Sequence, residues 1–202
     1  MLKRDQLRAM HSAHQAMAAL VAPPPRMWGS YGDGSWIVPP ARIDGPEYIH
    51  VGAGVVIHEH VWLTAAAGPG PTPSLRIGDG ASINRFVNIV CFESVTIGKD
   101  VLVADGAYIS DVDYPAGRGG GEGAGLAAAG LDLVHPRPVV VGDGVFVGAG
   151  AIIKPGVTIG EFSYISAGSI VTEDVAERTL VAGAPARAMR RWDPAEGSPT
   201  DS

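Results

Sequence analysis

The stretch Val141–Val171, which reads VGDGVFVGAGAIIKPGVTIGEFSYISAGSIV, returns to an aliphatic residue at every sixth position. Helices bring side chains to one face every 3.6 residues and strands every two, so a strict period of six fits neither element alone. A period of six instead indicates a short strand and a tight turn, repeated many times, which is typical of a parallel β-helix. The aliphatic positions of this run are Val141, Val147, Ile153, Ile159, Ile165 and Val171.

The same period occurs earlier in the chain. One run contains Ile77, Ile83 and Ile89 with Val95 in phase; a second, shifted by two residues, contains Ile97, Val103 and Ile109; a weaker third contains Val51, Ile57 and Leu63. A β-sandwich with glycine turns is the competing fold, and it requires Asp-Gly turns between strands of period two. Here the Asp-Gly pairs keep one fixed place within the hexad, so the sequence predicts an all-β protein built as a parallel β-helix.

Composition and charge narrow the range of partners and compartments. The 202 residues are 46% hydrophobic, enough for one continuous core, and the net charge of -6 argues against nucleic acid or an anionic membrane as the main partner. No apolar run approaches the roughly 18 residues of a membrane span. The single cysteine, Cys91, excludes an intramolecular disulfide and fits a reducing compartment. We therefore expect a cytoplasmic protein with no membrane span and no nucleic-acid partner.

The repeat divides the chain into three segments. We assign residues 1–40 to an N-terminal helix and lead-in segment, residues 41–175 to the β-helix, and residues 176–202 to a C-terminal extension with a disordered tail. Residues 5–21 have amphipathic helical spacing and are expected to cap the open end of the β-helix; binding of a separate partner by this helix is the alternative. The repeat is interrupted by a long excursion loop, residues 110–138, and a long loop in a regular solenoid is functional or a linker.

Three histidines in the weak hexads raise a metal site as an alternative. His50, His58 and His60 lie near one another in sequence, and β-helical carbonic anhydrases bind zinc through three histidines on adjacent coils. No fixed multiple of the repeat separates all three residues here. We therefore expect histidines exposed at turns and no metal.

Several segments together resemble the hexapeptide-repeat acyltransferases, and in particular the branch that contains sugar and polysaccharide O-acetyltransferases. The resemblance covers roughly the last two thirds of the chain, and its C-terminal segments are its most specific part. It implies a left-handed β-helix. The matching segments are Ile77-Gly78-Asp79-Gly80, Ser94-Val95-Thr96-Ile97-Gly98, Val141-Gly142-Asp143-Gly144-Val145-Phe146-Val147-Gly148, Pro155-Gly156-Val157-Thr158-Ile159-Gly160, Ala167-Gly168-Ser169-Ile170-Val171-Thr172 and Val181-Ala182-Gly183-Ala184-Pro185-Ala186-Arg187.

The resemblance also implies a homotrimer that binds acetyl-CoA in a groove between neighbouring β-helices. By match of motif, Ala149, Ala167 and Thr172 would line the pantetheine arm. Arg187 would bind the CoA phosphates, because a guanidinium forks onto phosphate oxygens. Lys154 is a further candidate at the phosphate end. Arg190 and Arg191 are candidates too, with a solvated tail as the alternative reading of both.

The expected catalytic histidine is the main departure from the family. An O-acyltransferase needs a general base, because a sugar hydroxyl is a poor nucleophile. The family carries that base in a segment like Ile-Ser-Asp-His-Asp-His, whereas here Val112 and Tyr114 occupy the two histidine positions. Tyr114 titrates too high, near ~10, and exposed carboxylates such as Asp111 and Asp113 are weak bases near ~4. His135, at the far end of the loop, is the candidate substitute.

Two functions from different classes follow from these residues. The first is an acetyl-CoA-dependent O-acyltransferase acting on a sugar or small hydroxylated acceptor. The alternative is a catalytically impaired β-helix that serves as a scaffold or CoA-binding protein, since Val112 and Tyr114 replace the histidines.

Overall fold

The computed structural model describes residues 25–67, 70–113 and 136–192. In these ranges the chain winds through three sheets in turn, so that consecutive strands belong to different sheets. We name the sheets A, B and C. Sheet A contains β1 (Ser30–Tyr31), β4 (Ile49–Val51), β7 (Ser74–Ile77), β10 (Ser94–Ile97), β13 (Val139–Val141) and β16 (Thr158–Ile159).

Sheet B contains β2 (Trp36–Ile37), β5 (Val56–Ile57), β8 (Ser82–Ile83), β11 (Leu102–Val103), β14 (Phe146–Val147), β17 (Tyr164–Ile165), β19 (Thr179–Gly183) and β20 (Ala186–Arg191). Sheet C contains β3 (Arg42–Asp44), β6 (Trp62–Ala65), β9 (Asn88–Cys91), β12 (Tyr108–Ser110), β15 (Ile152–Ile153) and β18 (Ile170–Val171). Two short 3-10 helices, η1 (Pro25–Met27) and η2 (Pro46–Tyr48), lie near the N-terminal end.

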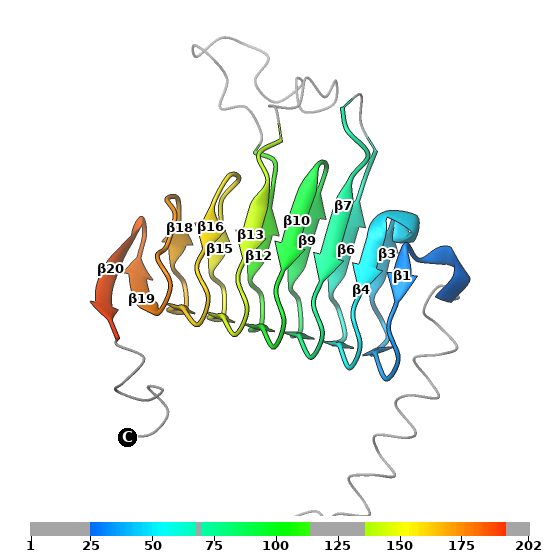
Figure 1. Ribbon diagram of the computed structural model, residues 1–202, viewed down its shortest axis with the longest axis horizontal. Coiled ribbons are helices and arrows are strands. Elements are labelled where there is room, and N and C mark those ends of the chain that lie inside the picture. The colour runs from blue at the N-terminus through cyan, green and yellow to red at the C-terminus, as the bar shows by residue number, and fades with distance from the viewer. Residues whose placement is uncertain (1–24, 68–69, 114–135, 193–202) are drawn as a thin grey trace, which may run out of the picture.

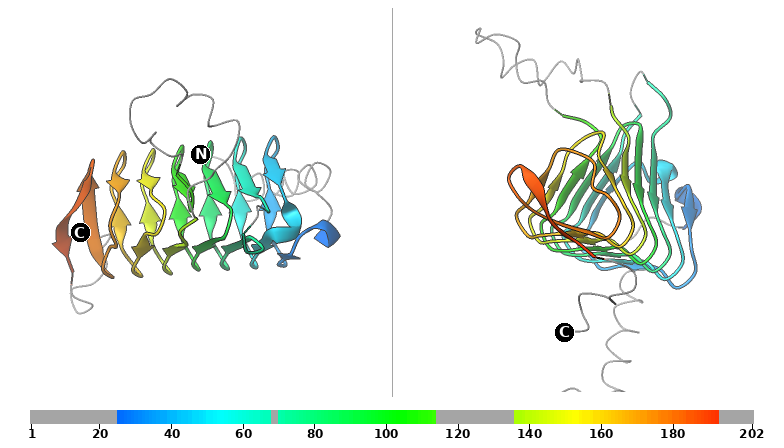
Figure 2. Two further views of the ribbon diagram at one scale, coloured as in Figure 1. Left: turned by 90° about the horizontal axis from the view of Figure 1, so that it is seen from above. Right: turned by 60° about the vertical axis from the view of Figure 1, so that its left-hand side comes forward.

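The strands stack in parallel register along one axis, as Figure 1 shows from β1 to β20. Seen toward the C-terminal end, the coils superpose as a three-sided outline (Figure 2, right). The antiparallel pairing of β19 with β20 is the exception among the strand pairs of the described residues. The predicted β-helix is therefore confirmed, and its coils provide the repeated corners on which a site can be built.

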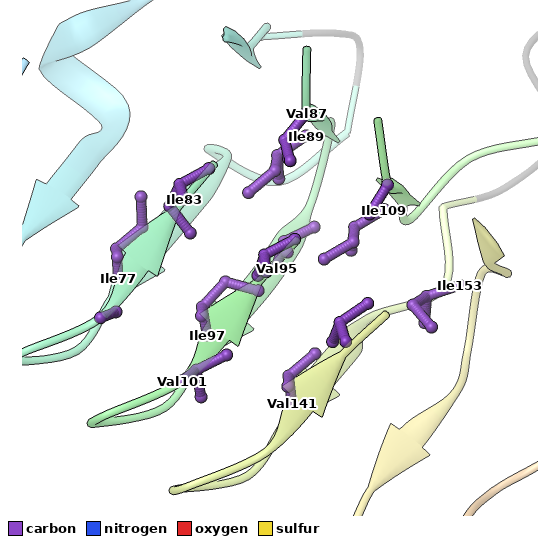
Figure 3. Close-up of a cluster of buried hydrophobic side chains, with 14 of the residues drawn as sticks. Ile77, Ile83, Val87, Ile89, Val95, Ile97, Val101, Ile109, Val141 and Ile153 are labelled. Atoms are coloured by element: carbon purple, nitrogen blue, oxygen red, sulfur yellow. The ribbon is translucent and has the colours of Figure 1, made fainter. Parts of the chain in front are cut away.

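The core is the column of aliphatic residues that the hexads predict. All of the aliphatic positions quoted from the four runs are buried. Figure 3 shows part of this column, with Ile77, Ile97 and Val141 on successive coils pointing into the same interior. Each coil thereby covers the apolar face of the next, as a solenoid requires.

The two-residue shift between the run that begins at Ile77 and the run that begins at Ile97 has a structural cause. The paired residues Val141 and Ile159 are 18 positions apart, whereas the paired residues Ile77 and Ile97 are 20 apart. The additional residues lie at the corner between β9 and β10, around Phe92 and Glu93. The C-to-A corner is therefore where insertions enter the coil, and the long excursion loop enters at the same corner between β12 and β13.

Aspartates at the A-to-B corner fasten neighbouring coils to each other. The Oδ1 atom of Asp79 accepts a hydrogen bond from the Ala53 N–H at 2.9 Å, and that of Asp143 accepts one from Lys99 N–H at 2.7 Å. The Ala53 bond and the nearby Lys99 ammonium lower the pKa of Asp79. These bonds satisfy backbone groups that the turns would otherwise leave to water.

Both ends of the β-helix differ from the segment boundaries that the sequence suggests. The first coil already begins at Ser30, which pairs with His50, so residues 30–40 belong to the coil and not to a lead-in. Tyr31 takes an aliphatic position there, and Pro39-Pro40 interrupts the pattern, which hid this coil. Beyond residue 175, β19 still pairs with β17 before β20 folds back.

Two expectations on the termini fall outside the described residues: the helix at 5–21 and the tail from Glu196. Within the described ranges, we find no helix that is long and apolar enough to cross a membrane.

Candidate active site

The excursion loop leaves and rejoins the β-helix at one point, which we call the loop root (Ser110–Asp113, Pro136–Arg137 and Lys154–Gly156). Backbone hydrogen bonds join the two ends of the loop across three coils. The N–H of Asp111 donates to Val90 O at 3.3 Å, Arg137 N–H donates to Asp111 O at 2.8 Å, and Gly156 N–H donates to Arg137 O at 3.0 Å. The loop root is thus fixed to the coils on both sides.

The carboxylate of Asp111 is fully buried in the turn between β9 and β10. It accepts hydrogen bonds from the backbone N–H groups of Phe92 at 2.9 Å, Glu93 at 2.7 Å and Ser94 at 2.9 Å. Consecutive backbone N–H groups that converge on one anion make a stable nest. The expectation of an exposed Asp111 is wrong, because the strand places its side chain inward under this turn. Asp111 positions the loop root.

Cys91 packs beside this carboxylate at the end of β9. Burial, and then the negative charge of Asp111, raise the pKa of the Cys91 thiol to about 12. The buried thiol is therefore disfavoured as a thiolate at neutral pH.

Asp113 and Lys154 meet at the loop root. The Lys154 ammonium donates to Asp113 Oδ1, and each side chain is about one third exposed, at 35% and 37%. Lys154 follows β15 on the coil after the loop, so the ion pair joins the loop entrance to the next coil. Of the predicted catalytic residues, Asp113 is the one that lies at the surface of the loop root. Tyr114 and His135 lie outside the described residues.

The predicted pantetheine residues occupy both edges of sheet C. Ala149 and Ala167 are exposed and stack at the corners that precede β15 and β18, where Gly168 N–H donates to Ala149 O at 2.8 Å. Thr172, also exposed, follows β18 at the opposite edge, on the coil beyond Lys154. Five residues of chain, about 16 Å when extended, separate Ala149 from Lys154. One chain therefore does not bring all the predicted residues into one pocket.

A groove of about 620 Å³ lies between the last coil and the β19–β20 hairpin. Arg187 is exposed at its wall, where its Nη1 donates to the carbonyl of Ala186 at 2.9 Å and lies 3.7 Å from Glu173 Oε1. Arg190 and Arg191 also line it. The lining combines aliphatic side chains with guanidinium groups and with the carboxylates of Glu173 and Asp174. The guanidinium groups suit a ligand that carries phosphate.

The sequence did not single out Arg137 or the corner at Phe92–Ser94, which hold the loop root. Both act through their backbone, so side-chain type gives no signal for them. The one sequence feature that marked this corner was the change of two residues in the phase of the six-residue repeat between Ile89 and Ile97.

The histidines of the alternative metal site are separated by the fold. His50 lies on the outer face of β4 in sheet A, while His58 and His60 lie at the corner between sheets B and C. In the part of the chain that the structure describes, no group of three or more His, Cys, Asp or Glu side chains could hold a metal ion.

Comparison with known proteins agrees with the fold and adds the family. The family described as bacterial transferase hexapeptide (six repeats) matches residues 138–173. The galactoside O-acetyltransferase of Escherichia coli (strain K12) is 30% identical over 154 residues, which cover 75% of this chain and 70% of that protein.

Two solved structures are similar in fold. The N-acyltransferase AntD from Bacillus cereus, in complex with dTDP and coenzyme A, has a TM-score of 0.71 at 18% identity, covering 96% of this chain and 92% of that one. A maltose O-acetyltransferase from Clostridium difficile 630 has a TM-score of 0.53 at 26% identity, covering 83% and 72%. The stacked coils of this chain agree with its similarity to the galactoside enzyme, which extends over most of both chains. The chain belongs to the hexapeptide-repeat acyltransferases.

Proposed function

We propose that the protein transfers an acetyl group from acetyl-CoA to a hydroxyl group of a sugar. The observation that carries this proposal is the 30% identity to a galactoside O-acetyltransferase over three quarters of the chain. The name of the maltose O-acetyltransferase, similar in structure at 26% identity, supports a sugar acceptor. The products would be an acetyl ester and free CoA.

The donor site would lie between two copies of the chain. Ala149 and Ala167 leave a smooth edge without large side chains, against which the pantetheine arm can lie, and Thr172 offers a hydroxyl on the other edge of the sheet. Because these edges are separated by up to about 16 Å of extended chain, we expect a neighbouring copy to bring its loop root to the alanine edge. The CoA phosphates would bind Arg187 at the C-terminal groove, with Lys154 and the other arginines of that hairpin as further candidates.

The acceptor hydroxyl would attack the thioester carbonyl while a base takes its proton, and a backbone N–H would stabilise the oxyanion. Asp111 is committed to three N–H groups and Asp113 is paired with Lys154, so neither is a ready base. His135 is the stronger candidate, because an imidazole titrates near neutral pH. It also precedes Arg137 of the loop root by two residues in the chain. Tyr114 directly follows Asp113 and is suited to a hydrogen bond to the acceptor.

Self-association as a homotrimer would use sheet B. Its outer face carries Leu102, Phe146, Tyr164 and Leu180 in register on successive coils, and the rings of Phe146 and Tyr164 stack at 4.5 Å between centroids. The matching row on sheet A is mostly polar, with Val140 as its apolar member; the row contains Ser30, His50, Arg76, Thr96, Val140 and Thr158. An apolar row is what the core of an interface between subunits requires. A cytoplasmic location would give the enzyme its donor, and the free Cys91 thiol agrees with a reducing compartment.

Acceptor-dependent release of CoA tests the proposal, measured as free thiol with acetyl-CoA and a panel of galactosides, maltose and glucosamine. We expect ester formation on a sugar hydroxyl, and a loss of at least about 100-fold in kcat for His135→Ala with unchanged CoA affinity. His58→Ala, at a corner away from the loop root, is the matched control and should keep full activity. CoA binding without turnover on any acceptor would favour the scaffold function, and transfer only to the amino group of glucosamine would contradict an O-acyltransferase.

A further inference from the structure

The outer face of sheet C carries a row of side chains that the donor site and the base do not use. The strand register places one residue of each coil in this row: Arg42, Trp62, Asn88 and Tyr108. Trp62 is 40% exposed and is the most exposed of the four tryptophans in the chain. Trp62 leaves much of its apolar ring exposed on the same sheet as β12, the strand that leads into the excursion loop, which makes it a candidate ligand contact.

Polar contacts hold the Trp62 ring in one orientation. Its Nε1–H donates to Asp44 Oδ2 at 2.8 Å, and Arg42 Nε–H donates to the same oxygen at 2.9 Å. The Arg42 guanidinium carbon lies 4.4 Å from the centre of the ring, so it covers one face. A ring that is fixed before binding loses little entropy when a ligand stacks on it.

Asn88 is the register neighbour of Trp62 on the side away from Arg42. In sheet C, β3 with Arg42 and β9 with Asn88 flank β6 on opposite sides, so a ligand on the ring face that Arg42 does not cover would lie over the β9 side of the row. Tyr108 follows on the next coil, and the backbones of β6 and β12 are two coil spacings apart, about 9.5 Å. A flat ring in contact with an aromatic side chain on each face needs about 7–8 Å. The shorter Asn88 side chain between them would form the floor of such a slot.

We propose that Trp62, Asn88 and Tyr108 form a subsite for a pyranose ring of the acceptor, so that the preferred acceptor is an oligosaccharide. This inference rests on the proposed function, because it concerns the acceptor of the same reaction. A pyranose presents C–H groups on its faces, which pack on the negative face of an aromatic ring, and hydroxyls on its rim, which an amide such as Asn88 can bind.

The subsite is continuous with the loop root. Tyr108 opens β12, which ends at Ser110, directly before Asp111. From Tyr108 to Asp113 the chain covers five residues, about 16 Å when extended. The distance from a sugar bound on Trp62 to the loop root would therefore exceed the length of one sugar ring. An oligosaccharide could occupy the subsite and the loop root at the same time.

A second copy of the chain is the competing occupant of this face. Charged residues are depleted at the centre of subunit interfaces, yet Arg42 and Asp44 border Trp62 directly. The uninterrupted apolar row of sheet B is the better interface. The composition around Trp62, with an indole, an amide, a phenol and a carboxylate, instead fits recognition of a polyhydroxylated ring.

Titration of the full-length protein with maltose, lactose and maltotriose, without acyl-CoA, tests the subsite by calorimetry and tryptophan fluorescence. We expect tighter binding of the trisaccharide, and a loss of about 10-fold or more in its affinity for Trp62→Ala. Trp62→Phe, which keeps a stacking face, should lose less. Phe162→Ala is the matched control, because Phe162 is exposed and is also covered by an arginine, Arg178, at 4.9 Å, but lies at the A-to-B corner. It should bind like the wild type.

The outcomes separate this inference from the proposed function. Sugar binding that depends on Trp62 without any acyl transfer would support the subsite and contradict the transferase. Acyl transfer with the same KM for maltotriose in Trp62→Ala and wild type would contradict the subsite alone. Failure of the wild type to bind any of the three sugars would overturn the subsite, as would a change in oligomeric mass on light scattering of Trp62→Ala.

Discussion

At the scale of single residues, Asp111 decides how the excursion loop is held. Its carboxylate fills a turn of the preceding coil and accepts hydrogen bonds from three backbone N–H groups there. A polar group in this position is needed because buried, unpaired N–H groups destabilise the folded state. Asp111 therefore anchors the start of the excursion loop to the preceding coil.

Replacing Asp111 by Ala should destabilise the protein and disable the site together. Each unpaired N–H costs about 1–3 kcal/mol, so we expect a loss of about 3 kcal/mol or more in the free energy of unfolding. Urea unfolding followed by circular dichroism, at one protein concentration, measures it. Asp79→Ala is the control, because the exposed Asp79 accepts one backbone N–H at a corner away from the loop root, and its effect should be small. Equal effects of both changes would contradict the anchor role.

Cys91 should resist alkylation in the folded protein. Because its pKa is raised to about 12, the thiolate fraction at pH 8 is about 10⁻⁴, and burial blocks access as well. The folded thiol keeps its proton more tightly than the unfolded one, so its contribution to stability is complete below pH 9 and is lost as the pH rises from 9 toward 12. Iodoacetamide labelling followed by mass spectrometry checks this. Complete labelling of folded protein at pH 8 within the time that labels urea-unfolded protein would be the opposite result.

At the scale of elements, the six-residue repeat specifies the residues at the corners as well as those in the strands. The aliphatic member fills the interior, and the glycine that follows allows two coils to approach at the corner. A Cβ atom added to Gly148 would lie 2.5 Å from Ala167 N, on the next coil. This contact also fixes the distance between Ala149 and Ala167, so the requirement for packing and the predicted donor site coincide there.

Gly148→Ala should therefore lower both stability and CoA affinity. The added methyl group meets backbone, which cannot turn away as a side chain can, so the two coils must separate locally. A thermal melt and CoA calorimetry measure the two effects. Gly70→Ala is the control, because a Cβ there meets nothing within 4 Å, and it should match the wild type in both measurements. A Gly148→Ala protein with wild-type melting and CoA affinity would show that the coils tolerate the change.

The sequence predicted the regular elements well and the irregular ones poorly, for a physical reason. An aliphatic column leaves a periodic trace because every coil must bury the same position, and the coils from Val51 to Val171 could be read from it. The first coil escaped notice because Tyr31 replaces the aliphatic residue. The role of Asp111 could not be read, since its partners Phe92, Glu93 and Ser94 contribute only backbone N–H groups, whose position depends on the fold.

At the scale of the whole molecule, the three faces of the β-helix have different characters. The outer row of sheet A is mostly polar, sheet B carries an apolar row, and sheet C carries Trp62, Asn88 and Tyr108 between the two edges that hold the predicted donor and loop residues. A single chain separates those edges, so assembly would complete the site. Which copies meet could not be predicted from the repeat, because a hexad specifies the interior and leaves the outer positions free.

Phe146→Glu should dissociate the assembly. A charge in the middle of the sheet B row would be buried without a partner in the interface, which disfavours association strongly. Light scattering after size exclusion should show a monomer with a wild-type circular dichroism spectrum and no acyl transfer. Val140→Glu is the matched control, since Val140 is an exposed strand residue on sheet A, and it should remain a trimer. A trimeric Phe146→Glu protein would place the interface elsewhere.

A crystal structure of the protein with CoA would show directly whether two copies of the chain share the donor site. We predict a trimer in which the pantetheine arm lies between Ala149 and Ala167 of one copy and the loop root of the next, with His135 nearest the sulfur and Arg187 at a phosphate. CoA bound within one chain, or away from the alanine edge, would contradict this prediction.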